Sequence, residues 1–214
     1  MAERASAKVE EDAAVPPPPC PPLPPAPAAL ELRPDAVPDG VSTFGWEPRP
    51  GLSSDENGLD LALLLARSSR CGGGSMGCVI ATPAGVIVAG HVNGPLWEPV
   101  AKRPASDVHA EVNAIGLCAR RGIATEGATA YVTMPPCRRC FAVLTAAGIR
   151  RVVTRKAFIP VDLKEMDKVA RREGMVLLAV VDTEERRAHN EQLAGKRKRP
   201  AEEEQKESGG DTGV

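Results

Sequence analysis

Residues 128–154 read ATAYVTMPPCRRCFAVLTAAGIRRVVT and contain two short runs rich in β-branched residues, separated by a longer segment. The two runs, residues 128–133 and 149–154, have the length and composition of strands. The segment between them follows Pro135 and Pro136, and proline fits the first turn of a helix, where the missing N–H needs no partner. This stretch therefore predicts a strand, a helix and a second strand.

The same alternation continues on both sides of this stretch. Residues 76–81 and 86–89 are β-branched runs joined by the turn TPAG, which favours a hairpin. A helix is predicted after Ser53-Ser54, because serine is a preferred N-cap residue. Two adjacent strands followed by helices and strands in alternation predict an α/β protein, a three-layer α/β/α sandwich with a mixed five-stranded sheet. The other predicted elements are helices over 55–69, 109–121, 162–173 and 184–193, and a strand over 175–181.

The flanks of this domain have a different composition. Thirteen prolines lie between Pro16 and Pro50, and such a run favours extended polyproline II over a helix or a central strand. We therefore expect a disordered proline-rich arm over residues 1–51, a domain over 52–182, and a C-terminal helix with a charged disordered tail over 183–214. Two interpretations of the arm remain open: a simple spacer, or a ligand for an aromatic-lined groove.

Charge and hydropathy exclude several classes of protein. The net charge is −1, while residues 52–182 carry 16 basic and 12 acidic side chains, a net of +4. This mild excess favours a phosphate-bearing ligand and is below the dense basic footprint of a duplex-binding domain. The longest apolar runs, such as residues 175–181, are far shorter than the roughly 20 residues that span a bilayer.

The N-terminus shows no apolar segment typical of a secretion signal, so we expect a reducing compartment, cytoplasmic and/or nuclear. The basic cluster Lys196–Arg199 is either a nuclear import signal or a solvated charge run. In a reducing compartment the six cysteines are expected to be free thiols or metal ligands rather than a disulfide framework.

Two short motifs carry the chemistry. His109 precedes Ala110-Glu111, and residues 135–140 read PPCRRC, each at the start of a predicted helix. A catalytic zinc site uses three nitrogen or sulfur ligands and keeps a fourth position for water, and one His with a Cys-x-x-Cys supplies that number. Glu111 lies two residues after the His, so it is better placed beside the water than on the metal, where a carboxylate can move protons.

HAEVNAI, residues 109–115, and PPCRRC together resemble the two signatures of the cytidine/deoxycytidylate deaminase superfamily, and the resemblance spans residues 59–181. The resemblance implies a cytidine deaminase-like fold and a zinc cofactor. It also implies that His109, Cys137 and Cys140 hold the zinc and that Glu111 is the proton shuttle.

Substrate contacts are implied less directly. The superfamily's backbone donors correspond to the amides of Ala110 and Cys137, and its sugar-binding asparagine corresponds to Asn93, in a turn one residue longer than the superfamily's. Pro136 is a further expected contact. Trp97, in the loop before His109, either stacks on a base or packs against its neighbours.

The resemblance implies an active zinc-dependent hydrolase that removes an amino group from a nucleobase, because Glu111 is retained. The expected substrate is a small-molecule cytosine nucleotide or nucleoside, dCMP-like, converted to the uracil product with release of ammonia. The alternatives are a tRNA adenosine deaminase or another nucleobase deaminase, and a non-enzymatic zinc module. A homo-oligomer and no membrane partner are expected. The scarcity of aromatic residues argues against a platform that stacks single-stranded bases.

The cysteines also allow two other interpretations. Cys-x-x-Cys alone is also a redox motif, but two arginines between the sulfurs and the His-x-Glu upstream disfavour that interpretation. A second zinc site could combine His91 with Cys71, Cys78 and Cys118, but the spacings of these residues match no known ligand pattern. Buried or incidental thiols are therefore the favoured interpretation.

Overall fold

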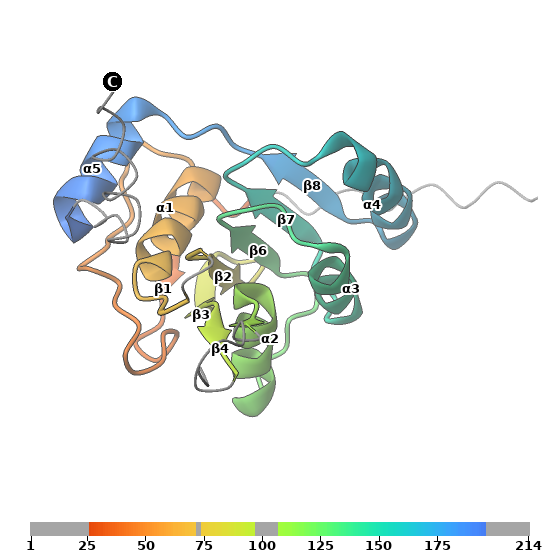
Figure 1. The fold of residues 1–214 in the computed structure, drawn as a ribbon, viewed down its shortest axis with the longest axis horizontal. Helices are drawn as coiled ribbons and strands as arrows, with labels where there is room; N and C mark the ends of the chain where they lie inside the picture. Colours follow the sequence, from red (N-terminus) through yellow and green to blue (C-terminus); the bar gives the residue numbers. More distant parts are fainter. Residues whose placement is uncertain (1–25, 72–73, 97–106, 196–214) are drawn as a thin grey trace, which may run out of the picture.

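The computed structural model describes residues 26–71, 74–96 and 107–195, and its centre is a six-stranded mixed sheet with the strand order β1-β3-β2-β6-β7-β8 (Figure 1). These strands are β1 (Glu31–Leu32), β2 (Gly77–Ala81), β3 (Val86–Val92), β6 (Thr129–Val132), β7 (Arg151–Thr154) and β8 (Val176–Ala179). A separate two-stranded pair consists of β4 (Gly94–Pro95) and β5 (Asp107–Val108). The helices are α1 (Ser54–Ala66), α2 (Ala110–Arg120), α3 (Arg138–Ala146), α4 (Pro160–Glu173) and α5 (Glu184–Ala194).

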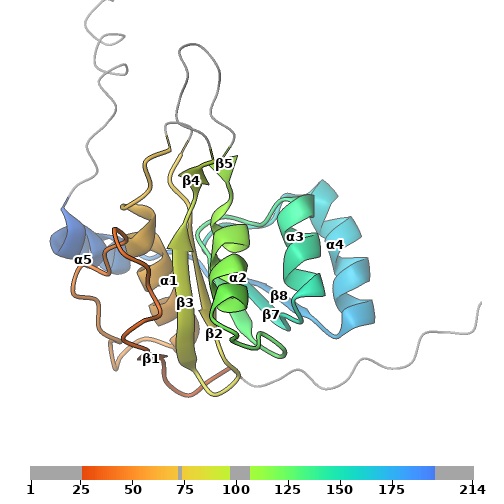
Figure 2. The ribbon, with the colours of Figure 1, turned by 90° about the horizontal axis from the view of Figure 1, so that it is seen from below.

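The helices lie in two layers around the sheet. Figure 2 shows α1 and α5 on one face and α2, α3 and α4 on the other. The predicted three-layer α/β/α sandwich with a mixed sheet is therefore confirmed. The five predicted strands are β2, β3, β6, β7 and β8, and β1 is a short sixth strand at one edge.

Alternation along the strands builds one core on each face of the sheet. In β2, Val79 belongs to the cluster under α1, whereas Ile80 belongs to the cluster under α2 and α3. In β6, Tyr131 and Val132 divide between the two clusters in the same way. Because successive side chains of a strand point to opposite faces, these fully buried strands need apolar residues at every position.

The sheet changes direction at β2. It pairs antiparallel with both β3 and β6, whereas β6, β7 and β8 are parallel to one another. The hairpin predicted at residues 82–85 joins β2 to β3, and β3 extends to Val92, three residues beyond the predicted strand. This extension carries the chain toward the ends of α2 and α3 at which the metal-binding motifs lie.

Helix α1 begins with a capping box. The Ser53 side chain accepts a hydrogen bond from the Glu56 backbone N–H, and the Glu56 carboxylate accepts one from the Ser53 backbone N–H at 3.0 Å. Farther along, Gly58 faces the ring of Tyr131, where an added Cβ would lie 2.6 Å from ring carbons. The absence of a side chain at Gly58 therefore sets how closely α1 packs on the sheet.

Residues 26–51 differ from the disordered arm that the sequence predicts. Leu30, Ala36 and Trp46 are buried in the core under α1, and β1 pairs in parallel with β3 through Glu31 and Leu32. Single apolar residues between prolines supply this packing, and a proline-rich segment is tolerated because it joins the sheet at an edge. The prediction of a disordered arm is therefore wrong for residues 26–51, which pack against the domain. The expectation for residues 1–25 lies outside the described residues.

Helix α5, predicted over 184–193, packs against α1 through an arginine. The Arg186 side chain is 1% exposed and donates to both carboxylate oxygens of Asp60 in α1, at 2.7 to 3.3 Å. It also donates to the carbonyl oxygens of Glu56 and Val181. A buried charge is tolerated only when it is paired and hydrogen-bonded, and these bonds provide that compensation.

Within the described part of the chain, no helix has the length and apolar character needed to cross a membrane. The basic cluster at 196–199 and Trp97 lie outside the described residues.

Candidate metal centre

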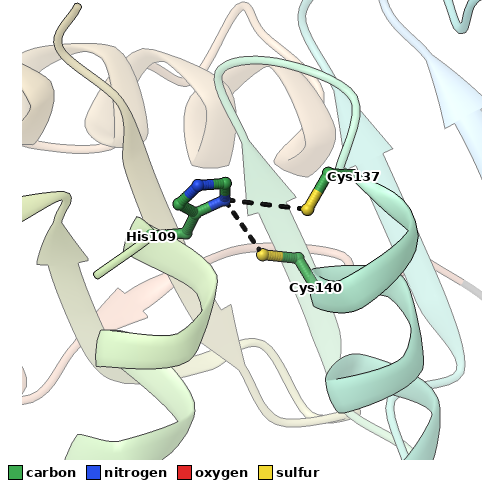
Figure 3. A group of neighbouring side chains, drawn as sticks. All are labelled: His109, Cys137 and Cys140. Atoms are coloured by element: carbon green, nitrogen blue, oxygen red, sulfur yellow. Dashed lines mark hydrogen bonds between the residues drawn. The ribbon is translucent and has the colours of Figure 1, made fainter. Parts of the chain in front are cut away.

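The two sequence motifs meet where α2 and α3 begin. His109 is the N-cap residue of α2, Cys137 is the N-cap residue of α3, and Cys140 lies in the first turn of α3. Both N-cap residues have extended backbone, and neither side chain makes a capping hydrogen bond. Figure 3 shows the imidazole of His109 facing the sulfurs of both cysteines.

The spacing of the three donor atoms suits a tetrahedral zinc ion. His109 Nδ1 lies 3.8 Å from Cys137 Sγ and 3.2 Å from Cys140 Sγ, and all three atoms lie within 4.8 Å of one another. Zinc–ligand bonds of roughly 2.3 Å to sulfur and 2.0 Å to nitrogen at a tetrahedral angle imply an N···S separation of about 3.5 Å. The two N···S separations in the structure lie on either side of this value, so the three residues fit zinc. Within the described residues, this is the one group of three His, Cys, Asp or Glu side chains that could hold a metal ion.

Glu111 lies beside this triad. Glu111 is 5% exposed, and its carboxyl group is in hydrogen-bonding contact with Cys140. Burial raises the pKa of Glu111, opposed by a hydrogen bond from its own backbone N–H and by the charge of His109. A carboxylate in such surroundings can accept a proton and release it again, which is the task of a general acid–base residue.

A pocket of about 230 Å³ opens next to the triad and Glu111. Its acidic residues, apart from the thiol of Cys137, are the carboxylic acids Glu111 and Asp107. Apolar walls come from both β6 and the segments that precede β2 and follow β6. The lining residues are Gly74, Met76, Asn93, Asp107, His109, Glu111, Val132, Met134, Pro135 and Cys137.

Asn93 lies in this pocket and is held firmly by its neighbours. Its side-chain oxygen accepts hydrogen bonds from the Ser69 hydroxyl at 2.7 Å and from the Met76 N–H at 2.8 Å. Its amide donates to the carbonyl oxygen of Gly74 at 2.9 Å. Asn93 therefore ties the end of β3 to the segment before β2 and forms one wall of the pocket.

The other sequence-predicted contacts are placed as follows. Ala110 is fully buried as the first residue of α2, and Pro136 is buried next to Cys137. Pro135, rather than Pro136, lines the pocket. Sequence reasoning missed Asp107, Met76 and Met134, which belong to neither motif. The one available signal was the position of Asp107, two residues before the ligand His109.

Three further cysteines within the described residues are not part of the triad. Cys78 and Cys118 are buried in the core beneath α2, and burial raises the pKa of both thiols. Cys71 is half-buried near the pocket mouth, where burial and a hydrogen bond to Asp107 raise its pKa. Thiols of this kind behave as small apolar groups rather than as metal ligands.

A sheet between two helical layers, with an imidazole, two sulfurs and a buried carboxylate meeting where two helices start, defines a zinc-binding deaminase domain. Residues 52–156 match the sequence model of the family described as the cytidine and deoxycytidylate deaminase zinc-binding region, and this domain belongs to that family. The family is zinc-binding, and the triad fits that metal.

Particular relatives are similar over part of the chain. The deoxycytidylate deaminase of Enterobacteria phage T2 is 46% identical over 48 residues, which are 22% of this chain and 26% of the phage protein. ComE operon protein 2 of Bacillus subtilis is 35% identical over 99 residues, which are 42% of this chain and 52% of that protein. The matches thus span about a quarter and about half of these relatives.

One solved structure is similar at lower identity. The apo crystal structure of dCMP deaminase from the cyanophage S-TIM5 is 22% identical, covers 59% of this chain and 96% of that chain, and has a TM-score of 0.49. That phage enzyme also has a structure in complex with dCMP and dUMP.

Proposed function

We propose that the protein is a zinc-dependent hydrolytic deaminase of a cytosine nucleoside or nucleotide, which releases ammonia and leaves the uracil product. The observation that carries the proposal is the position of Glu111, a buried carboxylate that faces the same pocket as His109 and Cys137. A metal-binding triad alone would also serve a structural role. A buried proton acceptor at an open pocket beside it is the arrangement that hydrolysis needs.

Different residues of the site have different roles in the proposed reaction. His109, Cys137 and Cys140 would hold the zinc, which supplies a Lewis acid that makes water a better nucleophile at neutral pH. Glu111 accepts the proton of the attacking water and gives it to the ring nitrogen. It then moves the proton of the newly added hydroxyl to the amine, which leaves as ammonia while the carbonyl of the product forms. The backbone amides of Ala110 and Cys137, at the starts of α2 and α3, would donate to the developing negative charge.

The pocket and the relatives support a substrate that contains one cytosine base. A volume of about 230 Å³ is below the range of drug-sized ligand sites, so it suits one base rather than a stack. Relatives from phages T2, T4 and D29 carry the name deoxycytidylate deaminase, which makes dCMP the first compound to test. We also infer that the protein forms homo-oligomers and acts in the cytoplasm and/or the nucleus. Light scattering and microscopy of the tagged full chain test these two inferences.

An ammonia-release screen of the zinc-loaded full chain tests the function. The panel contains cytidine, deoxycytidine, their monophosphates, guanine, adenosine and tRNA. We expect release from a cytosine compound and conversion to its uracil product. Glu111→Gln is the matched control, which should keep the zinc and lose turnover by roughly 100-fold to 10,000-fold.

Three results contradict the proposal in different ways. Ammonia release from adenosine or tRNA but not from cytosine compounds contradicts the substrate. Near wild-type turnover by Glu111→Gln contradicts the role of this carboxylate. A zinc-loaded wild-type protein that is inactive toward the whole panel contradicts the activity.

A further inference from the structure

The acceptors available to a ligand in the pocket are few. A side-chain amide oxygen has two lone pairs, and those of Asn93 are already used by the Ser69 hydroxyl and the Met76 N–H. Asn93 can therefore donate to a ligand but has no remaining acceptor capacity. Among the described lining side chains outside the triad, this leaves the carboxylates of Glu111 and Asp107 as acceptors.

These two carboxylates lie in different surroundings. Glu111 is buried against the triad, whereas Asp107 is exposed and also lines a second hollow, which Arg138 and Arg139 line as well. Asp107 belongs to β5, where its pairing with Pro95 of β4 fixes its backbone. Glu111 is thus placed at the reacting end of a ligand, and Asp107 is placed at the outer end.

The carboxylate of Asp107 is not paired with a cation among the described residues. It forms no ion pair within the part of the chain that the structure describes, and its hydrogen-bonding neighbour there is the Cys71 thiol. A zinc ion with two thiolates and a neutral imidazole has no net charge, so it does not offset this carboxylate. No Lys or Arg is among the described residues that line the pocket, and Arg138 and Arg139 line the second hollow instead. On its pocket side, Asp107 therefore presents negative charge with no described cation among the lining residues.

We infer that Asp107 is a specificity-determining residue, which accepts a hydrogen bond from one sugar hydroxyl of the substrate and rejects substrates that carry phosphate on that hydroxyl. The inference rests on the proposed function, because it places the base at Glu111 and the sugar toward Asp107. A hydroxyl donates well to a carboxylate, whereas a phosphate group is anionic at neutral pH and is repelled by it.

The consequence is a preference for monomers over polymers. A nucleoside has all its sugar hydroxyls free, and a monophosphate leaves one of its two chain-forming hydroxyls free. A nucleotide inside a polynucleotide carries phosphate on both sides, so one phosphate would always meet Asp107. The protein would thus act on free nucleosides and on one isomer of the monophosphate.

The test compares phosphate positions in one assay. Deoxycytidine, its 5′-monophosphate, its 3′-monophosphate and its 3′,5′-bisphosphate are given to zinc-loaded wild-type protein, Asp107→Asn and Asp39→Asn. Asp39 is an exposed aspartate of a neighbouring hollow, so its variant makes the same charge change outside the pocket. The readout is the ratio of kcat/KM for each phosphorylated compound to that for deoxycytidine.

In the wild-type protein we expect this ratio to be low for one monophosphate isomer and for the bisphosphate. Asp107→Asn should raise those two ratios by about tenfold or more, since an amide can donate to phosphate. Asp39→Asn should leave them unchanged. Zinc content is measured in parallel, so that a damaged metal centre is recognised.

Other outcomes overturn the inference. Wild-type turnover that is indifferent to phosphate position, or an Asp107→Asn variant that changes all four substrates by one factor, assigns Asp107 a purely structural role. Both results leave the proposed deaminase activity standing. A zinc-loaded wild-type protein that deaminates no cytosine compound overturns the proposed function, and the inference with it.

Discussion

Among single residues, the two cysteines of the metal centre have unequal surroundings. Cys137 is exposed, whereas Cys140 is buried and contacts Glu111. Burial and the neighbouring carboxylate raise the pKa of the Cys140 thiol in the metal-free protein. Since a metal ligand must be the thiolate, the cation itself has to stabilise this charge when it binds.

Cys140→Ser should therefore lose zinc. A structural or catalytic zinc needs all of its protein ligands, so we expect metal content to fall from about one ion per chain to a small fraction of that. Elemental analysis of the purified variant measures this loss. Cys118→Ala is the matched control, because Cys118 is also a buried cysteine but lies outside the triad. Equal zinc content in the two variants would contradict the assignment of the ligands.

Two helical glycines should respond in opposite directions to alanine. At Gly58 an added Cβ meets the rigid ring of buried Tyr131, so Gly58→Ala should lower the free energy of unfolding by roughly 1–3 kcal/mol. At Gly116 the nearest atom is the mobile end of Arg120 at 3.3 Å, so Gly116→Ala should raise it by about 0.5–1 kcal/mol. Urea unfolding of both variants provides the comparison. A Gly58→Ala variant as stable as wild type would mean that α1 can move away from the sheet.

At the scale of elements, α1 depends on a cap that carries charge. Hydrogen bonds from the Ser53 backbone N–H and hydroxyl lower the pKa of Glu56, and the nearby charges of Arg186 and Arg49 act in the same direction. A folded-state pKa below the unfolded value adds stability above the unfolded pKa, and this stability is lost as the pH falls through the folded pKa.

Glu56→Gln should reveal this dependence, because glutamine keeps a hydrogen bond but not the charge. At pH 7 we expect wild type to be more stable than the variant by roughly 0.3–1 kcal/mol. The difference should shrink as the pH falls below about 4.3, the ordinary pKa of glutamate, since Glu56 is then increasingly protonated. Urea unfolding of both proteins across this range measures it. If the difference in the free energy of unfolding does not change with pH, the stabilisation does not come from the charge of Glu56.

For the whole molecule, residues 26–51 are part of the domain. Removing residues 1–25 should leave the free energy of unfolding close to that of the full chain, because Leu30, Ala36 and Trp46 are kept. Removing residues 1–51 should lower it by about 3 kcal/mol or more, since Trp46 alone is a large buried side chain. Thermal unfolding of the two truncations tests this. Equal stability of the two would show that the packing of 26–51 contributes nothing.

The sequence predicted most of this molecule because its signals are local. The alternation of strands and helices, the Ser53 cap and the two motifs can each be recognised within a few residues, and each element is present in the structure. The meeting of His109 with Cys137 and Cys140 was not a local signal, and it was implied by the resemblance of the two motifs to the signatures of the deaminase superfamily.

What the sequence could not show depends on partners far along the chain. Leu30 and Trp46 lie in a proline-rich segment, and their burial depends on contact with α1 and β3. Arg186 lies in a helix whose residues are mostly polar, and its burial depends on the ion pair with Asp60. Asp107 joins the pocket through the pairing of β5 with β4, and two-residue strands leave no periodic pattern.

The starts of α2 and α3 have a consequence for the protein without its metal. His109 and Cys137 occupy N-cap positions, where the side chain of serine, threonine, aspartate or asparagine would accept a hydrogen bond from the first turn, and neither side chain makes this bond. A cation bound by both residues would hold the first turns of both helices in place. Chelation should therefore let these two turns fray, with faster deuterium uptake at the amides of residues 110–113 and 138–141, whereas the first turn of α1 stays protected by its own serine.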